Sequence, residues 1–129
     1  MASVSQTCTL PCTSRGTSTV GAHGTQADGT PWRIAVKHPD DSQPPLQIVD
    51  LQDESLSVSG ISGKSFLDDE GNEQGHVIDP RTGRPTQAAH AAAVICDSAA
   101  ESDAWATALL VDPALTPPSH IRVCDQIDS

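Results

Sequence analysis

Residues 89–111 read AHAAAVICDSAAESDAWATALLV and carry the marks of a strand and a helix in direct succession. Residues 89–96 are mostly small or β-branched apolar side chains, which is typical of a buried strand. Ser98 with Glu101 three residues later is a capping box, strong helix formers follow it, and Asp112 before a proline ends the pattern. The stretch therefore predicts a buried strand followed directly by a helix.

Apolar residues along this helix fall into two rows at helical spacing. Ala104, Ala108 and Val111 form one row, and Trp105 with Leu109 forms a neighbouring row. We therefore expect these two rows to face the core of the protein.

Alternating or apolar runs elsewhere predict further strands. They cover residues 32–37, 46–51, 55–59 and 75–79, with a last strand expected over residues 120–124. The acidic turn at Asp53-Glu54 predicts a hairpin between the second and third of these strands, and residues 60–75 are expected to form a loop. Several strands with one main C-terminal helix predict an α+β fold, a mixed α/β layered domain.

Length and composition limit the size of the core. The 129 residues fit one domain, with 2% aromatic and 36% hydrophobic residues, so the core must consist mainly of Ala, Val, Ile and Leu. Such a core is thin for an independent domain, which raises the hypothesis that a partner surface is missing.

Charge and segment patterns exclude several classes of partner. The net charge is −10, and residues 38–79 hold ten acidic side chains against Lys64 alone, so nucleic acid is a poor partner. No apolar run reaches the length of a membrane span and no secretory signal is visible, which predicts a cytoplasmic chain. The four cysteines lack zinc-site spacing and are expected to be reduced.

Asp103 and Thr107 lie four residues apart on the predicted helix, so both oxygens project from one face. One interpretation is a solvated carboxylate near the start of a helix, where the dipole favours negative charge, beside an ordinary threonine. The other is half of a Mg²⁺ site, with the carboxylate and the hydroxyl as two of six oxygen ligands. Spacing alone favours the first.

Residues 75–85, GHVIDPRTGRP, combine an imidazole, a carboxylate and two guanidinium groups. His76 is either a structural histidine or a functional one. A functional His76 would be a general base, since imidazole titrates near neutrality, or a cofactor-binding contact to a ligand ring. Residues 79–83 form a turn in the simplest interpretation, begun by Asp79 and closed by Gly83. A turn can also bind ligand, because its backbone N–H groups and Arg81 could face a pyrophosphate.

Five segments in this order resemble one known family. They are residues 28–36 (DGTPWRIAV), Ser59-Gly60, residues 63–66 (GKSF), residues 76–85 (HVIDPRTGRP) and residues 102–109 (SDAWATAL). The resemblance is to the FAD:protein FMN transferases, the ApbE family. It covers about residues 25–112 and corresponds to the second half of the family's T-fold-like domain.

The resemblance implies an enzyme that binds FAD and Mg²⁺ and transfers FMN to a Thr or Ser hydroxyl of an acceptor flavoprotein, with release of AMP. It implies that Asp103 and Thr107 are metal ligands. It also implies that His76 assists deprotonation of the acceptor hydroxyl, and that Asp79 and Thr82 line the flavin-nucleotide cleft. Arg81 is expected to add a contact to the pyrophosphate.

The family's first half has no counterpart in this sequence. Residues 1–24 are expected to be disordered or miscast, with residues 20–24 (VGAHG) a damaged remnant of a Gly-Gly-Asp-x-Arg strand. Residues 25–112 are expected to be the C-terminal half of a flavin transferase domain, and residues 113–129 a tail. A separate N-terminal half is therefore an expected partner, and the resemblance leaves export or membrane tethering open.

Three functions stay open at this point. The first is a truncated FAD:protein FMN transferase. The second is FAD pyrophosphate hydrolysis, with water in place of the protein hydroxyl. The third is a non-catalytic flavin-binding or interaction fragment, since half a cleft rarely orders a metal.

Overall fold

Strand β11 (Ala89–Cys96) runs through the middle of the protein, in a computed structural model that describes residues 4–6, 12–15, 19–36, 42–45, 47–61 and 65–128. Every residue of β11 except His90 is buried. Its alternate side chains enter two different apolar clusters, with Ala91, Ala93 and Ile95 on one side and Ala92, Val94 and Cys96 on the other. Because both faces are covered, the strand must be apolar throughout, and the prediction of a buried strand over residues 89–96 is confirmed.

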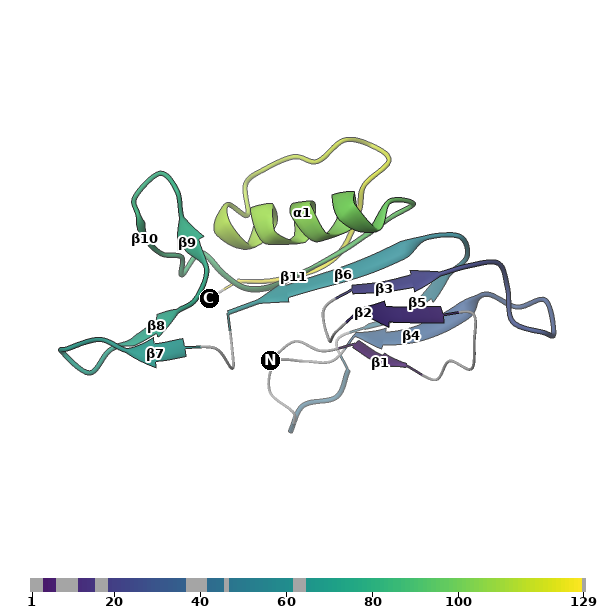
Figure 1. The fold of residues 1–129 in the computed structure, drawn as a ribbon, viewed down its shortest axis with the longest axis horizontal. Helices are drawn as coiled ribbons and strands as arrows, with labels where there is room; N and C mark the ends of the chain where they lie inside the picture. The colour runs from purple at the N-terminus through teal and green to yellow at the C-terminus, as the bar shows by residue number, and fades with distance from the viewer. Residues whose placement is uncertain are drawn as a thin grey trace.

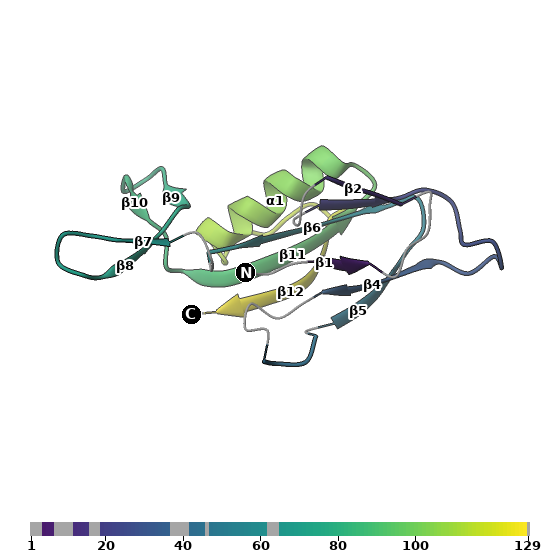
Figure 2. The same ribbon diagram turned by 60° about the horizontal axis from the view of Figure 1, so that its bottom comes forward.

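The protein is built of three layers. The middle layer is a five-stranded antiparallel sheet whose strands, in spatial order, are β12 (Arg122–Asp128), β11, β6 (Ser55–Gly60), β3 (Thr19–Ala22) and β2 (Cys12–Arg15). Helix α1 (Ala99–Val111) lies along β6 and β11 on one face (Figure 1). A three-stranded sheet of β1 (Val4–Gln6), β4 (Trp32–Val36) and β5 (Gln47–Leu51) covers the other face (Figure 2).

Two short hairpins extend from one end of these layers, as Figure 1 shows. One pairs β7 (Ser65–Leu67) with β8 (Glu73–Gly75), and the other pairs β9 (Ile78–Asp79) with β10 (Arg84–Pro85). Strands with one helix in separate layers confirm the expected α+β class. No helix in the described part of the chain is long and apolar enough to cross a membrane.

Each boundary between layers has its own apolar core. The core between the two sheets contains Val20, Ala22, Trp32, Ile34, Val36, Val49, Leu51, Leu56, Val58, Ala91, Ala93 and Ile95. The core between the five-stranded sheet and α1 contains Ala92, Val94, Cys96, Ala106, Leu109 and Ile121, with the half-buried Trp105 packed against it. The two tryptophans therefore lie in different layers.

The ends of α1 lie where the sequence predicts them. Ser98 is the N-cap, in extended conformation, and its side chain accepts a hydrogen bond from the backbone N–H of Glu101 at 3.3 Å. Asp112 is the C-cap, and its backbone N–H donates to the Ala108 carbonyl at 2.9 Å. The Pro that follows has no N–H to continue the helix.

The buried face of α1 differs from the predicted one. It consists of Ser102, Ala106, Leu109 and Leu110. The row of Ala104, Ala108 and Val111 is not this face, because Ala104 is exposed and the other two are only half-buried. The second predicted row fits better, because Leu109 is buried and the half-buried Trp105 packs against the same core. The prediction counted apolar side chains alone, whereas the real face begins with a serine, Ser102, that is 0% exposed.

Hydroxyl groups connect the N-terminal part of α1 to β6. Ser102 Oγ donates to the Ala99 carbonyl at 3.0 Å and lies 2.8 Å from Ser57 Oγ, which in turn lies 3.1 Å from Thr19 Oγ1. A hydroxyl has one proton, so Ser57 must donate to Ser102 and Thr19 must donate to Ser57. This chain of hydrogen bonds is what allows Ser57 and Ser102 to be fully buried.

The connection between β5 and β6 is not a hairpin, so that prediction is wrong. Strand β5 pairs with β4, while β6 pairs with β3 and β11 in the other sheet. The chain changes sheets at Asp53, which has a positive φ of 52°. The Asp53 carboxylate fixes this crossing by accepting a hydrogen bond from the Gly24 backbone N–H at 2.8 Å.

Two other segments contain strands that the sequence patterns did not indicate. Part of the N-terminal segment expected to be disordered forms β3, whose Val20 and Ala22 are buried in the core between the sheets, with β1 and β2 before it. Residues 60–75 contain the β7–β8 hairpin, whose turn is held by Asp68. Both sets of strands are too short to show a period in the sequence.

The remaining strands follow the predictions with small shifts. Strands β4, β5 and β6 lie where residues 32–37, 46–51 and 55–59 predict them. The last strand, β12, begins at Arg122 rather than at residue 120. The strand predicted over residues 75–79 is shorter, because only Ile78–Asp79 pairs with β10.

The buried Ser57–Ser102 hydrogen bond gives a stability prediction. We expect Ser57→Ala to lower the free energy of unfolding by about 1–3 kcal/mol, because Ser102 then lacks a donor in a buried position. In the double variant Ser57→Ala/Ser102→Ala the loss should be smaller than the sum of the two single losses, since no hydroxyl acceptor is left behind. Urea denaturation of the four proteins measures both effects.

The matched control is Ser119→Ala, which removes the hydroxyl of an exposed residue in the turn before β12 and should change stability by less than about 0.5 kcal/mol. Losses that simply add in the double variant would contradict the hydrogen-bonded chain between β6 and α1.

Candidate functional site

The conspicuous run of residues 76–85 forms the β9–β10 hairpin. Asp79 faces Arg84 in its register, and the carbonyl of Asp79 accepts hydrogen bonds from the backbone N–H groups of Thr82 at 3.2 Å and Gly83 at 2.8 Å. Gly83 has a φ of +69°, a conformation that glycine adopts without strain. The predicted turn, begun by Asp79 and closed by Gly83, is confirmed.

Arg81 joins this hairpin to the end of helix α1. Its guanidinium binds the Asp79 carboxylate through two contacts, with Nε 3.0 Å from Oδ1 and Nη2 2.8 Å from Oδ2. Its third contact places Nη1 2.8 Å from Oδ2 of Asp112, the C-cap of α1. Figure 1 shows the hairpin standing beside that end of the helix.

A second contact supports the same junction. Thr86, which is 5% exposed, places its Oγ1 3.5 Å from the Val111 carbonyl in the last turn of α1. The Arg81 and Thr86 contacts together fix the hairpin to the helix. Arg81 therefore links the hairpin and the helix within the protein. Two of its five N–H groups have no partner among the described residues, and its contact to pyrophosphate stays a prediction.

The link also sets the charge state of Asp79. Hydrogen bonds from the Arg81 side chain, and then from the Arg81 backbone N–H at 2.8 Å, hold the pKa of the Asp79 carboxyl below its ordinary value. The same carboxylates raise the pKa of Arg81. Asp79 is thus ionised at any pH near neutrality, and its side chain is only 13% exposed.

Asp103 and Thr107 both lie on the exposed surface of α1. Thr107 Oγ1 donates a hydrogen bond to the Asp103 carbonyl at 3.2 Å and lies 3.1 Å from Ser59 Oγ on β6. The Asp103 carboxylate makes no ion pair or side-chain hydrogen bond with any other residue whose side chain the structure describes. The two oxygens are therefore on one helix face, as the spacing predicts.

The donor set of this face fits a hard divalent cation. The proton of Thr107 goes to the Asp103 carbonyl, so Ser59 must be the donor in the second hydrogen bond, and one lone pair of Thr107 Oγ1 remains. That lone pair and the Asp103 carboxylate are the oxygen ligands that Mg²⁺ prefers. Two side-chain oxygens are only part of the six that Mg²⁺ takes, so the rest must come from water, phosphate or other backbone.

His76 and Thr82 lie on the exposed side of the hairpin region. His76 stands between β8 and β9, and its imidazole has no hydrogen-bond partner within the described ranges. Thr82 Oγ1 accepts a hydrogen bond from the Arg84 backbone N–H at 3.3 Å, which stabilises the turn.

An open depression of about 530 Å³ lies beside both hairpins and is lined by Gln74, Arg84, Pro85 and Gln87. Its volume falls within the range of about 300–1,000 Å³ that is usual for small-molecule sites. Arg84 makes no ion pair with the residues that the structure describes, so a cation is available at this depression.

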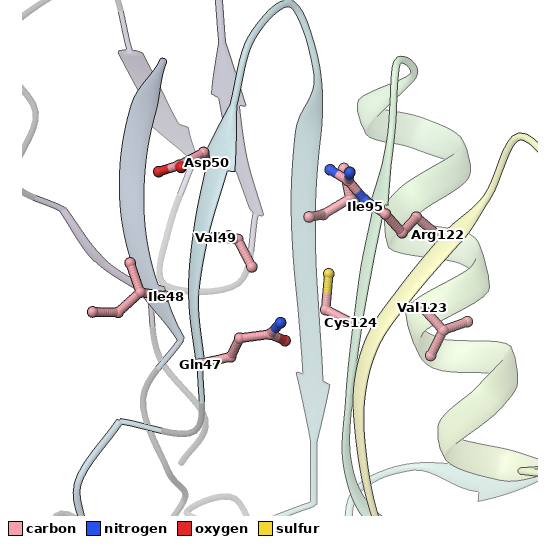
Figure 3. Close-up of a pocket in the computed structure, with 8 residues that line it drawn as sticks. All are labelled: Gln47, Ile48, Val49, Asp50, Ile95, Arg122, Val123 and Cys124. Atoms are coloured by element: carbon pink, nitrogen blue, oxygen red, sulfur yellow. The ribbon is translucent and has the colours of Figure 1, made fainter. Parts of the chain in front are cut away.

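A second depression, of about 340 Å³, lies between the edge strands β5 and β12 (Figure 3). It is lined by Gln47, Ile48, Val49, Asp50, Ile95, Arg122, Val123 and Cys124. None of the six candidate site residues contributes to it. It is therefore a separate feature, at the open side of the core between the two sheets.

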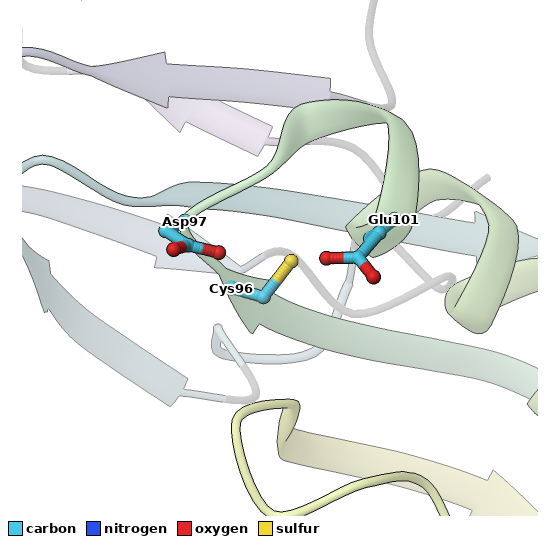
Figure 4. A group of neighbouring side chains, drawn as sticks. All are labelled: Cys96, Asp97 and Glu101. Atoms are coloured by element: carbon cyan, nitrogen blue, oxygen red, sulfur yellow. The ribbon is translucent and has the colours of Figure 1, made fainter.

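Cys96, Asp97 and Glu101 bring a sulfur and two carboxylates within 4.8 Å of one another at the start of α1 (Figure 4). The Cys96 thiol donates to the Ser98 carbonyl at 2.9 Å, and burial, followed by the two nearby carboxylates, raises its pKa. A metal would need the thiolate, which these surroundings disfavour. Neither Cys96 nor Cys124, the described cysteine side chains, is in a disulfide.

Comparison with known proteins identifies the family of this chain. A model of the ApbE family matches residues 16–122, which is most of the chain. The chain belongs to the ApbE family. The match extends on both sides beyond residues 25–112, and it includes strand β3 of the middle sheet.

Relatives within the ApbE family include the FAD:protein FMN transferase of Escherichia coli K12, which is 38% identical over 96 residues. The Rhodobacter capsulatus protein of the same name is 35% identical over 96 residues. These alignments cover 71% and 74% of this chain but 26% and 17% of the relatives. The chain thus spans about a quarter or less of the length of these relatives.

Solved ApbE structures likewise match most of this chain but only part of their own length. The Thermotoga maritima ApbE protein superposes with a TM-score of 0.65 at 29% identity, covering 73% of this chain and 30% of that one. The apo form of the Pseudomonas stutzeri flavinyl transferase ApbE superposes with a TM-score of 0.58 at 35% identity, covering 73% and 29%. The layered arrangement of strands and helix is therefore that of the ApbE fold.

Sequence reasoning missed three residues that organise this ApbE-type site. Asp112 was interpreted only as a helix terminator, Thr86 was not considered, and Ser59 was named only within a segment of the family resemblance, with no role. The sequence does contain a pattern that indicates the position of Ser59. Serines occupy alternate positions 55, 57 and 59 of β6, so they share the face that meets α1.

The Arg81 link gives a pH prediction. Because the pKa of Asp79 is depressed in the folded state, the link stabilises the protein at neutral pH, and this contribution is lost as the pH falls through the folded-state pKa. We expect Arg81→Gln to raise the pKa of Asp79 only part of the way to its ordinary value, because the backbone N–H of residue 81 still donates. Carboxyl ¹³C NMR titration measures this shift.

Arg84→Gln is the matched control on the same hairpin and should leave the Asp79 titration unchanged. An Asp79 pKa that is equal in the wild type and in Arg81→Gln would show that the link does not form in solution.

Proposed function

We propose that this chain carries the C-terminal part of a FAD:protein FMN transferase and takes part in moving FMN from FAD to a Thr or Ser hydroxyl of an acceptor flavoprotein, with release of AMP. We take the activity from the enzyme name of the relatives, and we assign its steps to the motif residues of this chain. FAD is the substrate, and Mg²⁺ is the cation assigned to Asp103 and Thr107.

One observation carries the proposal. The ion pairs of Arg81 with Asp79 and Asp112 hold the hairpin that bears Asp79 and Thr82 against the helix that bears Asp103 and Thr107. His76 lies two residues before the first strand of this hairpin. Two motifs that are separate in the sequence are thereby parts of one rigid junction. A flavin-nucleotide contact surface and a cation-binding surface can act on the same pyrophosphate only if they are fixed relative to each other.

Asp103 and Thr107 hold the cation in this proposal, with the carboxylate and the remaining lone pair of the hydroxyl as ligands. A Mg²⁺ ion held by these two residues would supply positive charge to offset the negative charge of the pyrophosphate. Ionised Asp79 keeps its turn in place through Arg81, so that the exposed backbone and side chain of Thr82 can line the nucleotide cleft. The two remaining N–H groups of Arg81 are available to a phosphate oxygen.

His76 acts as the general base. Its imidazole is exposed and has no partner among the described residues, so it can accept the proton of an acceptor hydroxyl. The hydroxyl oxygen then forms a bond to the phosphorus of the FMN moiety, the bond from that phosphorus to the bridging oxygen breaks, and AMP leaves with the bridging oxygen. The proton stays on His76 until it passes to solvent.

The proposed cation site is incomplete within the described residues, because it has two side-chain ligands. The chain spans about a quarter of the length of the Escherichia coli relative, so we propose that a polypeptide equivalent to the family's remaining part completes the cleft. FAD hydrolysis and flavin binding without catalysis are the competing functions, and each has a distinct outcome in the test.

The direct test incubates the chain with FAD, Mg²⁺ and an acceptor flavoprotein, and detects covalent flavin by in-gel fluorescence and by the mass of the acceptor. A parallel reaction contains the family's missing N-terminal part as a second polypeptide. We expect labelling to require that polypeptide and to fall at least about 100-fold in Asp103→Asn, since a cation ligand at the reacting phosphate is lost.

Glu101→Gln is the matched control, because it neutralises an exposed carboxylate on the same helix, and it should label as the wild type does. AMP and FMN released without any acceptor would favour hydrolysis. FAD binding that is indifferent to Asp103→Asn, with no transfer under any condition, would favour a non-catalytic fragment and overturn the proposal.

A further inference from the structure

Two chains of hydroxyl groups connect β6 to α1, and only the inner one is fully buried. The inner chain passes from Ser57 to Ser102 and ends at the Ala99 carbonyl. The outer chain passes from Ser59 to Thr107 and ends at the Asp103 carbonyl. Both begin on the same face of the same strand, because Ser57 and Ser59 are two residues apart.

The spacing of the two chains follows from the geometry of a helix lying along a strand. Two strand residues advance by about 6.6 Å and five helix residues by about 7.5 Å, so Ser57–Ser102 and Ser59–Thr107 contacts can form together. Five helix residues also turn the side chain by about 140°. Ser102 therefore faces the core while Thr107 lies at its edge, in agreement with their buried and exposed positions.

The difference in burial gives the two serines different physical roles. Ser57 is 0% exposed, so its hydrogen bond satisfies a group that water cannot reach. Thr107 is exposed, so water could satisfy its hydroxyl without help from Ser59. Ser59 instead orients the Thr107 hydroxyl, because its proton occupies one lone pair of Thr107 Oγ1 and leaves the other lone pair in a fixed orientation.

We propose that Ser59 is a positioning residue for the cation site, which orients the Thr107 hydroxyl so that its remaining lone pair and the Asp103 carboxylate bind one divalent cation. The inference rests on the proposed function, since it assumes that Asp103 and Thr107 are the ligands. Ser59 does not touch the cation. It acts through Thr107, in the manner of the groups behind the ligands of other metal sites.

The test measures cation binding directly, with Mn²⁺ as the probe and electron paramagnetic resonance of the unbound ion as the readout. The protein is the whole chain, in the absence of flavin. We expect Ser59→Ala to raise the Mn²⁺ dissociation constant by about tenfold, which is the usual effect of removing a group that orients a ligand. Ser59→Thr keeps the hydroxyl and should restore binding to near the wild-type value.

Two further variants separate this inference from the proposed function. Asp103→Asn removes a proposed ligand and should abolish Mn²⁺ binding. Ser55→Ala changes a serine on the same face of β6 whose side chain makes no hydrogen bond to the hydroxyl of Ser102 or Thr107, and it should bind Mn²⁺ as the wild type does. Thermal unfolding of Ser59→Ala should match the wild type, which shows that a loss of binding is not a loss of fold.

The outcomes are distinct. If Asp103→Asn loses Mn²⁺ and Ser59→Ala does not, the cation site stands and the role of Ser59 is overturned. If Asp103→Asn binds Mn²⁺ as well as the wild type does, both the assigned cation site and the role of Ser59 are overturned. Loss in Ser59→Ala with recovery in Ser59→Thr is the result that supports the inference.

Discussion

The rest of the structure depends on the burial of β11 on both faces. One set of its alternate side chains packs against the three-stranded sheet and the other against α1, so this strand forms part of both cores. Four of its eight residues are alanine, and these small side chains let the helix and the second sheet approach it closely. The position of the helix that carries Asp103 and Thr107 therefore depends on a strand whose buried side chains can hardly be replaced by larger ones.

The candidate site is built where the rigid layers meet the hairpin. Helix α1 is fixed along its length by apolar contacts and by the hydroxyl chain through Ser102, while its C-terminal end is fixed to the hairpin by Arg81. Exposed ion pairs contribute little to stability in general. The Arg81–Asp112 ion pair contributes through geometry instead, since it determines the position of the turn at Asp79 relative to the helix.

Much of the fold could be predicted because its main elements carry strong local patterns. The apolar run of residues 89–96, the Ser98 cap and the Asp112-Pro113 terminator place β11 and α1 correctly. Pairing could not be predicted in the same way. Strand β6 pairs in the other sheet from β5, and its serines contact a helix that lies about forty residues later in the chain. No local pattern contains that information.

The candidate site was predictable to the level of residue types but not of partners. The i, i+4 spacing places Asp103 and Thr107 on one face, and the structure shows both exposed there. The partners of Arg81 and Thr107 come from residues 31 and 48 positions away in the sequence, Asp112 and Ser59. Such contacts follow from tertiary structure alone, so the sequence could not indicate them.

The position of the two tryptophans has a spectroscopic consequence. The chain has no tyrosine, and Trp32 lies in the core between the sheets while Trp105 lies in the core under the helix. Each of the two cores thus contains one intrinsic fluorophore, and the two are in different surroundings, because Trp32 is 4% exposed and donates from Nε1 to the His23 carbonyl at 3.2 Å, whereas Trp105 is half-buried. Replacing either tryptophan would let the emission of the other report whether the helix layer separates from the sheet before the two sheets part.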